Sequence, residues 1–227
     1  EKEDVVIKFV GDSGDGMQLM GSIFSETIAI SGNDLATFPD FPAEIRAPRN
    51  TVAGVSGYQI HFGHRKVLSP GDLSDVLVAF NPASLKANLK WVKKGGTIVV
   101  DESSFDEKTI EKSGYKTNPL EDDSLDSFNV IKVPITTLTR DSVADLGFSG
   151  KSADKMKNMF VLGMLYNMFA KDIQPALNYF EKKFASKPDL IKANSIVIQT
   201  GYQFASTIEA IPSFVIKKTE LESGRYR

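Results

Sequence analysis

The sequence predicts an α/β fold: a Rossmann-like, doubly wound sheet, mainly parallel, with extra C-terminal helices. Three observations predict this class. A β-branched and aromatic run, VVIKFV at residues 5–10, is followed by a glycine-rich turn and a helical repeat of apolar residues. Strand and helix patterns then alternate as far as residue 135. After that point the pattern is helical, so we expect the late helices to pack on the same sheet.

The first unit is a strand, a glycine turn and a helix. The run at 5–10 suits a buried parallel strand, because both of its faces are apolar. From Met17 to Ile30, apolar residues recur every three or four positions, and Ser31-Gly32-Asn33 supplies a stop signal. We therefore expect a helix over 17–30.

Prolines mark the next segment. Pro39, Pro42 and Pro48 disfavour a helix or a central strand, so residues 39–50 are expected to form an ordered surface loop. Residues 51–62 alternate well enough for a long strand that two glycines interrupt.

The remaining elements are read from the same patterns. We expect strands at 75–80, 97–101 and 129–135, a helix over 82–96 with a glycine end, and sheet-edge excursions over 102–128. Helices are expected at 136–146, 154–169, 173–185 and 188–209. The methionine-rich helix 154–169 favours core packing, with an adaptable subunit contact as the alternative.

Composition limits the function classes. The chain has 227 residues, 41% of them apolar and 25% charged, and a net charge of −2, so nothing electrostatic favours nucleic acid or an anionic membrane as a partner. The sequence contains no cysteine, which excludes cysteine-ligated iron–sulfur clusters and thiolate zinc sites on this chain. No apolar stretch approaches the roughly 20 residues of a membrane span, so a cytoplasmic protein is expected.

The glycine turn is the strongest candidate binding site. In Gly11-x-x-Gly14-x-Gly16, small residues allow a ligand close to the backbone, and the amide N–H groups at the start of a helix attract anions such as a diphosphate. Asp12 and Asp15 would repel a diphosphate unless they are paired or point away. The alternative is a merely tight turn in which Asp12 caps the helix, and spacing alone leaves both open.

Four segments in order carry a resemblance to a known family. VGDSGDGMQLMG, FPDFPAEIRAPRNTVAGVSGYQIHFG, LVAFNPASL and KNMFVLGMLYNMF resemble the gamma subunit, or gamma domain, of the 2-oxoacid:ferredoxin oxidoreductases. The 2-oxoglutarate branch, where this domain is fused to part of the alpha subunit, is the most similar. The likeness covers nearly the whole chain. It implies a gamma domain over 1–212 and a connector or tail over 213–227.

The resemblance also implies a division of labour. The complete enzyme decarboxylates a 2-oxoacid on thiamine diphosphate, passes electrons through an iron–sulfur cluster to ferredoxin, and transfers the acyl group to coenzyme A. Thiamine diphosphate, magnesium and the iron–sulfur cluster belong to the other domains or subunits. The gamma domain helps to bind coenzyme A. This chain alone is therefore expected to be inactive, with no catalytic residue and no metal ligand of its own.

Carried onto this sequence, the resemblance assigns the coenzyme A diphosphate to one turn, with amide N–H groups and a serine hydroxyl as donors: Gly11, Asp12, Ser13, Gly14, Asp15 and Gly16. Asn81 would lie at the carboxyl end of a buried strand, where its amide bonds the ligand or, equally, starts the helix at Pro82. Arg46 could pair with a phosphate or with the substrate carboxylate. The alternative for Arg46 is an ion pair with Glu44 across a subunit interface.

Two other functions stay open. A free-standing NAD-dependent oxidoreductase would use the same turn, with Asp34 near the distance expected for a ribose partner, although the glycine spacing is irregular. A purely structural subunit would touch no ligand.

Overall fold

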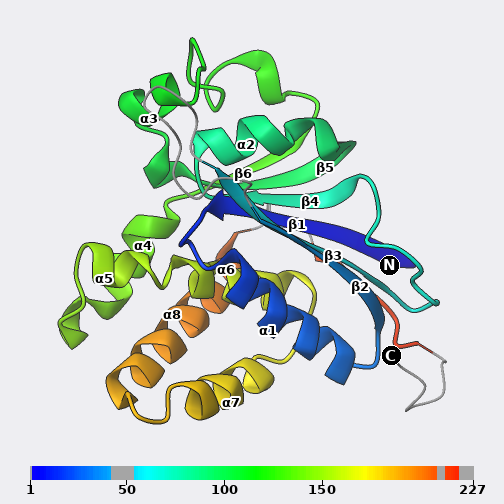
Figure 1. The fold of residues 1–227 in the computed structure, drawn as a ribbon, viewed down its shortest axis with the longest axis vertical. Helices are drawn as coiled ribbons and strands as arrows, with labels where there is room; N and C mark the ends of the chain where they lie inside the picture. The colour runs from blue at the N-terminus through cyan, green and yellow to red at the C-terminus, as the bar shows by residue number, and fades with distance from the viewer. Residues whose placement is uncertain (1, 42–53, 209–212, 220–227) are drawn as a thin grey trace.

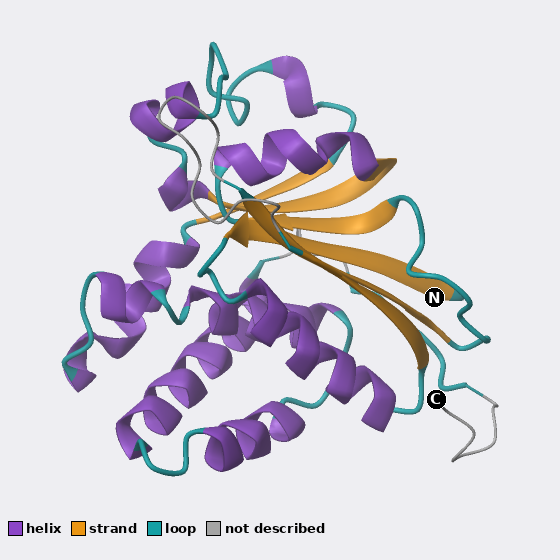
Figure 2. Cartoon of the chain, in the orientation of Figure 1, coloured by secondary structure: helices purple, strands orange, loops and turns teal. Residues whose placement is uncertain are grey.

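The chain forms one sheet with helices on both faces, as the computed structural model shows for residues 2–41, 54–208 and 213–219 (Figures 1 and 2). In the described residues the sheet has six strands in the order β2-β3-β1-β4-β5-β6. Their bounds are β1 Asp4–Asp12, β2 Asp34–Asp40, β3 Val55–Gly63, β4 Ser74–Ala79, β5 Val92–Asp101 and β6 Asn129–Val133.

Strand direction places five strand ends on one side. β1, β4, β5 and β6 are parallel neighbours, whereas β3 is antiparallel to both β1 and β2. β2 therefore runs in the same direction as β1. The last residues of these five strands form what we call the carboxyl edge, the side on which ligands of open α/β sheets bind. The sheet is mainly parallel, as predicted, but the reversal of β3 was not predicted.

The helices divide between the two faces (Figure 1). One face is covered by α1 Met17–Ile30, α6 Lys157–Met168, α7 Gln174–Lys183 and α8 Pro188–Thr207. The other face carries α2 Pro82–Asn88 and α3 Glu107–Lys112, while α4 Ile135–Val143 and α5 Lys151–Asp154 lie beyond the carboxyl edge. Short 3₁₀ turns occupy Leu89–Trp91, Glu102–Ser104, Asp123–Leu125 and Ala144–Leu146.

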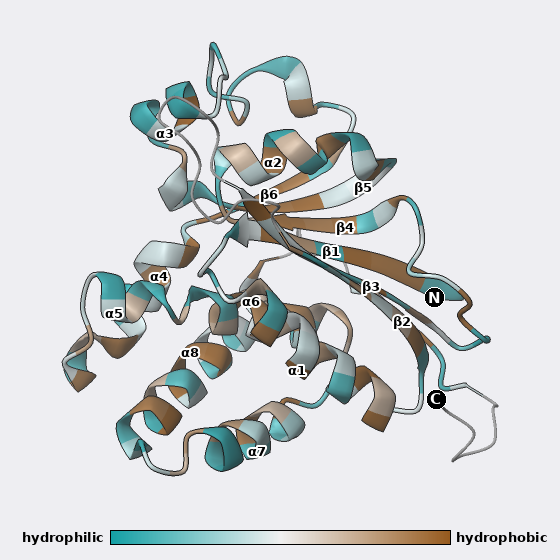
Figure 3. Ribbon diagram, in the orientation of Figure 1, coloured by the Kyte–Doolittle hydropathy of each residue, from teal (hydrophilic) through white to brown (hydrophobic). Residues whose placement is uncertain are grey.

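Aromatic side chains fill the larger core, between the sheet and α1, α6 and α8. The fully buried Phe24 of α1 meets Phe9 and Phe62 edge-on, with ring centroids 6.3 and 5.9 Å away. A smaller cluster under α2 includes Leu77 and Leu85. Figure 3 shows the matching apolar stretches along the central strands. Burial of this surface is the main source of stability.

Helices α6 and α8 cross at two glycines. A Cβ on Gly163 would lie 2.0 Å from the carbonyl oxygen of Ile198, and a Cβ on Gly201 would lie 2.0 Å from that of Phe160. Only a residue without a side chain allows the two backbones to come so close. The side chains of α6 are almost all buried, which confirms core packing for the methionine-rich helix.

Several predicted boundaries needed correction. The helix over 17–30 is confirmed, but Pro39 and Asp40 belong to β2, where an edge strand tolerates proline. The helix expected over 82–96 ends at Asn88, because Val92 already begins β5. In the described part of the chain, no helix is long and apolar enough to cross a membrane.

Part of the predicted connector packs on the domain. Phe214 stacks on Phe169 with ring centroids 5.2 Å apart, and Ile216 is buried. The amide of Thr219 donates to the carbonyl of Gly32, which follows the end of α1. The packed chain therefore extends at least to residue 219, and the rest of the predicted connector lies outside the described residues.

Candidate functional site

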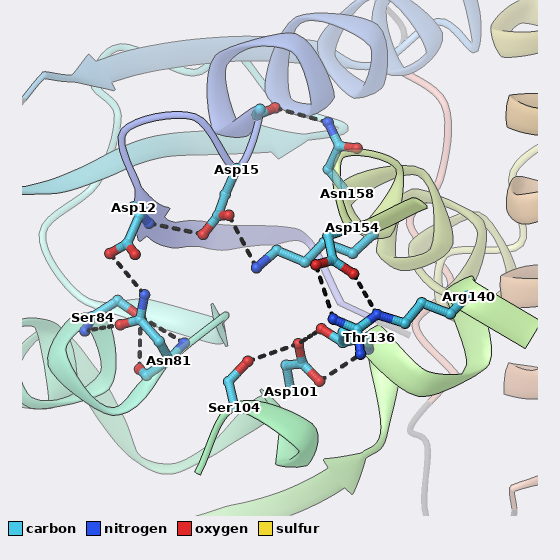
Figure 4. Close-up of polar contacts among 12 residues, drawn as sticks. Asp12, Asp15, Asn81, Ser84, Asp101, Ser104, Thr136, Arg140, Asp154 and Asn158 are labelled. Carbon is cyan, nitrogen blue, oxygen red and sulfur yellow. Dashed lines mark hydrogen bonds and ion pairs between the residues drawn. The ribbon is translucent and has the colours of Figure 1, made fainter. Parts of the chain in front are cut away.

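The glycine turn joins β1 to α1 at the carboxyl edge (Figure 4). Two hydrogen bonds close it: the Asp15 amide donates to the carbonyl of Asp12 over 3.0 Å, and the Asp12 amide donates to Asp15 Oδ2 over 2.9 Å. Gly14 has φ 141° and Gly16 has φ 76°, both in the region that favours glycine. The glycines are thus required by the shape of the turn.

Gly16, and not Asp12, precedes the first turn of α1. Gly16 is the N-cap residue, and no side chain caps the helix. The carboxylate of Asp12 instead accepts a hydrogen bond from Asn81 Nδ2 over 2.9 Å. The interpretation of Asp12 as the helix cap is therefore wrong, because Asn81 draws its carboxylate toward α2.

Several backbone donors of the turn have no acceptor among the described residues. In the described part of the chain, the amides of Ser13, Gly14 and Gly16 have no hydrogen-bond acceptor. The first amides of α1 also lack intrahelical acceptors, as in every α-helix. No atom of the described residues comes within 4 Å of the position of a Cβ on Gly14. Among the described residues, none closes the position next to Gly14 to an incoming anion.

Asn81 has a structural role at the same edge. Its Oδ1 accepts a hydrogen bond from the Ser84 amide over 2.8 Å, and the Ser84 hydroxyl completes a capping box at the start of α2. The Nδ2 group bonds Asp12, so the side chain links α2 to the turn. The helix-start role is confirmed, and contact with a ligand stays a prediction.

The two carboxylates of the turn have different surroundings. Partial burial, and then the negative charge of Asp15, raise the pKa of Asp12 above its usual value, although the hydrogen bond from Asn81 opposes this. Asp15 forms an ion pair with Lys157 of α6 over 3.0 Å, and both side chains are largely buried. The negative charge of Asp15 is thus paired with a lysine of the same chain, whereas the carboxylate of Asp12 accepts a hydrogen bond from the uncharged side-chain amide of Asn81.

Sequence reasoning missed two residues at the start of α6. Besides Lys157, the buried Asn158 donates from Nδ2 to the carbonyl of Gly16 over 3.3 Å. A signal for them existed, because two polar residues stand at the head of an otherwise apolar helix. The core-packing prediction rests on the apolar residues of this helix and gives neither polar residue a role.

A second polar cluster lies beside the turn (Figure 4). Asp101 ends β5, is fully buried, and accepts hydrogen bonds from the amide and hydroxyl of Thr136 and from the Ser104 hydroxyl. Next to it, Arg140 holds Asp154 through two bonds of 2.6 and 2.9 Å. These polar groups are hydrogen-bonded to one another. The bonds of Asp101 link α4 to the end of β5, and the Arg140–Asp154 pair links α5 to α4.

Arg46 and Glu44 lie outside the described residues, but the ends of their loop are fixed. In the sheet ladder Val55 pairs with Asp12, and Asp40 pairs with Gly57 two residues further along β3. The loop that carries Arg46 therefore leaves from and returns to the carboxyl edge next to the turn.

Asp34 lies at the opposite edge. It is the first residue of β2, is paired with Gly63, and accepts a hydrogen bond from the Val67 amide over 2.7 Å. A ribose-binding carboxylate would have to stand at the carboxyl edge, near the glycine turn. The interpretation of Asp34 as the ribose-binding residue of an NAD site is therefore wrong.

Comparison with known proteins places the chain among oxidoreductase subunits. It is 44% identical, over 99% of its length, to the 2-oxoglutarate oxidoreductase subunit KorA of Mycobacterium tuberculosis, and spans 35% of that protein. A ketoisovalerate oxidoreductase subunit, VorA of Methanothermobacter marburgensis, is 30% identical over 47% of the chain and 21% of VorA. The chain thus spans about a third or less of these relatives.

Two solved structures share the fold. One is the 2-oxoglutarate:ferredoxin oxidoreductase of Magnetococcus marinus with 2-oxoglutarate, coenzyme A and succinyl-CoA bound, with a TM-score of 0.74 and 23% identity over 97% of this chain and 34% of that one. The other is the pyruvate oxidoreductase subunit PORC of Thermotoga maritima, with a TM-score of 0.61 and 17% identity over 89% of this chain and 97% of that one. The family model of pyruvate ferredoxin/flavodoxin oxidoreductase matches residues 6–204. The chain belongs to the pyruvate ferredoxin/flavodoxin oxidoreductase family.

Proposed function

We propose that this chain is the coenzyme A-binding gamma component of a 2-oxoacid:ferredoxin oxidoreductase, with 2-oxoglutarate as the 2-oxoacid. The likeness to KorA along nearly the whole chain supports the choice of substrate. The Magnetococcus enzyme, which has the same fold over this length, was solved with coenzyme A bound, and this supports the choice of ligand.

The open glycine turn is the observation that carries the proposal. A diphosphate needs several N–H donors that converge on a site with room for its oxygens. The amides of Ser13, Gly14 and Gly16, which have no acceptor among the described residues, provide such donors, and the position at Gly14, clear of every described atom within 4 Å, provides the room. Because both ends of its loop lie beside the turn, Arg46 is a suitable second phosphate ligand.

The rest of the reaction belongs to other domains or subunits in this proposal. The sequence has no cysteine that could hold an iron–sulfur cluster. Thiamine diphosphate, with its magnesium ion, would supply the decarboxylation chemistry, and the cluster would carry electrons to ferredoxin. The task of this chain is to hold the diphosphate of coenzyme A so that its thiol can reach the acyl group.

The proposal is tested in the complete enzyme with its partner subunits. We expect Gly14→Val and Arg46→Ala each to raise the KM for coenzyme A about tenfold or more, the effect of losing a charge-assisted contact. The KM for the 2-oxoacid should stay unchanged.

A matched control separates binding from backbone strain. Gly95 also has a positive φ, 76°, and open space at its Cβ position, but it stands in β5 near the amino edge. Gly95→Val should leave the KM for coenzyme A unchanged. If Gly14→Val and Arg46→Ala altered neither this KM nor kcat, or if a complex without the domain kept full activity and coenzyme A affinity, the assignment would be wrong.

A further inference from the structure

The carboxylates of the glycine turn pose an electrostatic problem for a diphosphate site. Two negative charges within a six-residue turn oppose the binding of a diphosphate. A nearby cation on the protein would remove part of that repulsion. Lys157 is placed to do this, because its Nζ lies 3.0 Å from Asp15 Oδ1.

Lys157 is held firmly in this position. It is the first residue of α6, its side chain is 13% exposed, and its Nζ also lies over the ring of Phe80, 5.1 Å from the centroid. The next residue, Asn158, bonds the carbonyl of Gly16 (Figure 4). The start of α6 therefore contacts the turn at both Asp15 and Gly16.

The ion pair also controls the direction of the Asp15 side chain. While Oδ1 faces Lys157, Oδ2 accepts the amide of Asp12. The Asp15 carboxylate is therefore held toward Lys157 and the Asp12 amide (Figure 4). A diphosphate at the turn would then meet N–H groups and the carboxylate of Asp12, which has a hydrogen bond from Asn81 but no ion pair as close as that of Asp15.

We propose that Lys157 is a positioning residue of the diphosphate site, which neutralises Asp15, holds its carboxylate in this orientation and so sets the affinity of the turn for coenzyme A. This inference rests on the proposed function. Lys157 acts through Asp15 and has no direct role in the reaction.

The test compares four variants in the complete enzyme: Lys157→Gln, Lys157→Arg, Asp15→Asn and the double variant Lys157→Gln/Asp15→Asn. We expect Lys157→Gln to raise the KM for coenzyme A about tenfold and leave the KM for the 2-oxoacid unchanged. Lys157→Arg keeps the charge and should stay within about twofold of the parent. Asp15→Asn can still accept the Asp12 amide and should not weaken coenzyme A binding.

The double variant is decisive. Once Asp15 is neutral, the lysine is no longer needed, so coenzyme A affinity should return to within about twofold of the parent enzyme. If the double variant binds coenzyme A as weakly as Lys157→Gln alone, Lys157 does not act through Asp15 and the inference is overturned.

The outcome for Gly14→Val distinguishes this inference from the proposed function. If Gly14→Val weakens coenzyme A binding while Lys157→Gln does not, this inference fails and the proposed function stands. If Gly14→Val, Arg46→Ala and Lys157→Gln all leave the KM for coenzyme A and kcat unchanged, both fail. Thermal unfolding of each purified complex verifies that the variants are folded, and Lys157→Met, which keeps the packing over Phe80 without the charge, should match Lys157→Gln.

Discussion

Replacing Gly201 by alanine should destabilise the domain, although alanine is the better helix former. By helix propensity alone, Gly201→Ala would stabilise α8 by about 1 kcal/mol. The new Cβ, however, would lie 2.0 Å from the carbonyl oxygen of Phe160, where contacts under 3.0 Å essentially never occur. Helices α6 and α8 would have to separate by about 1 Å, and overpacking of this kind costs roughly 3 kcal/mol. The net loss of stability is therefore about 2 kcal/mol.

Thermal and urea unfolding followed by circular dichroism measure this difference. For a chain of this size, about 2 kcal/mol lowers the melting temperature by roughly 4–8 °C. Gln199→Ala is the matched control, because Gln199 lies on the same turn of α8 and faces water. Its stability should change by less than about 0.5 kcal/mol. A Gly201→Ala variant that melts at or above the parent temperature would refute the argument that backbone contact outweighs propensity at this crossing.

Three further variants test ion pairing and capping. Burial raises the pKa of Asp75, but bonds from Lys2, the Val6 amide and Lys93 outweigh it and hold that pKa below its usual value. The stabilisation by the Asp75 carboxylate is therefore complete above about pH 4 and is lost as the pH falls through the folded-state pKa. Asp75→Asn should lower the melting temperature at pH 7, and the difference in melting temperature between this variant and the parent should become smaller in acid. Asn81→Ala removes a helix cap and should lower the free energy of unfolding by about 1 kcal/mol. Asn81→Asp should keep the cap but weaken coenzyme A binding, because it adds a negative charge beside Asp12. Equal coenzyme A affinity in both variants would contradict this.

Local signals made much of the fold predictable. The helix at 17–30 has both an apolar repeat and a glycine stop, so its bounds agree with the structure. The reversal of β3 could not be read from the sequence, because alternation along a strand does not reveal its direction relative to its neighbours. The early start of β5 at Val92 was missed since the preceding residues have helical spacing until Trp91.

The candidate site was predictable where its parts are adjacent in sequence. Glycine spacing pointed to the turn, and FNP pointed to the carboxyl end of β4. The partners of the two turn carboxylates could not be predicted in this way. Lys157, for example, lies 142 residues after Asp15 and meets it only through the packing of α6. Such long-range pairing depends on tertiary contacts that no local pattern encodes.

The hairpin of β2 and β3 is anchored in the sheet independently of the segment that joins its two strands. Its two strands are fixed by backbone ladders to each other and to β1, so residues 41–54 can be exchanged without altering the frame that presents them. Grafting this stretch from a relative onto the same sheet is therefore a direct way to measure what it contributes to coenzyme A affinity.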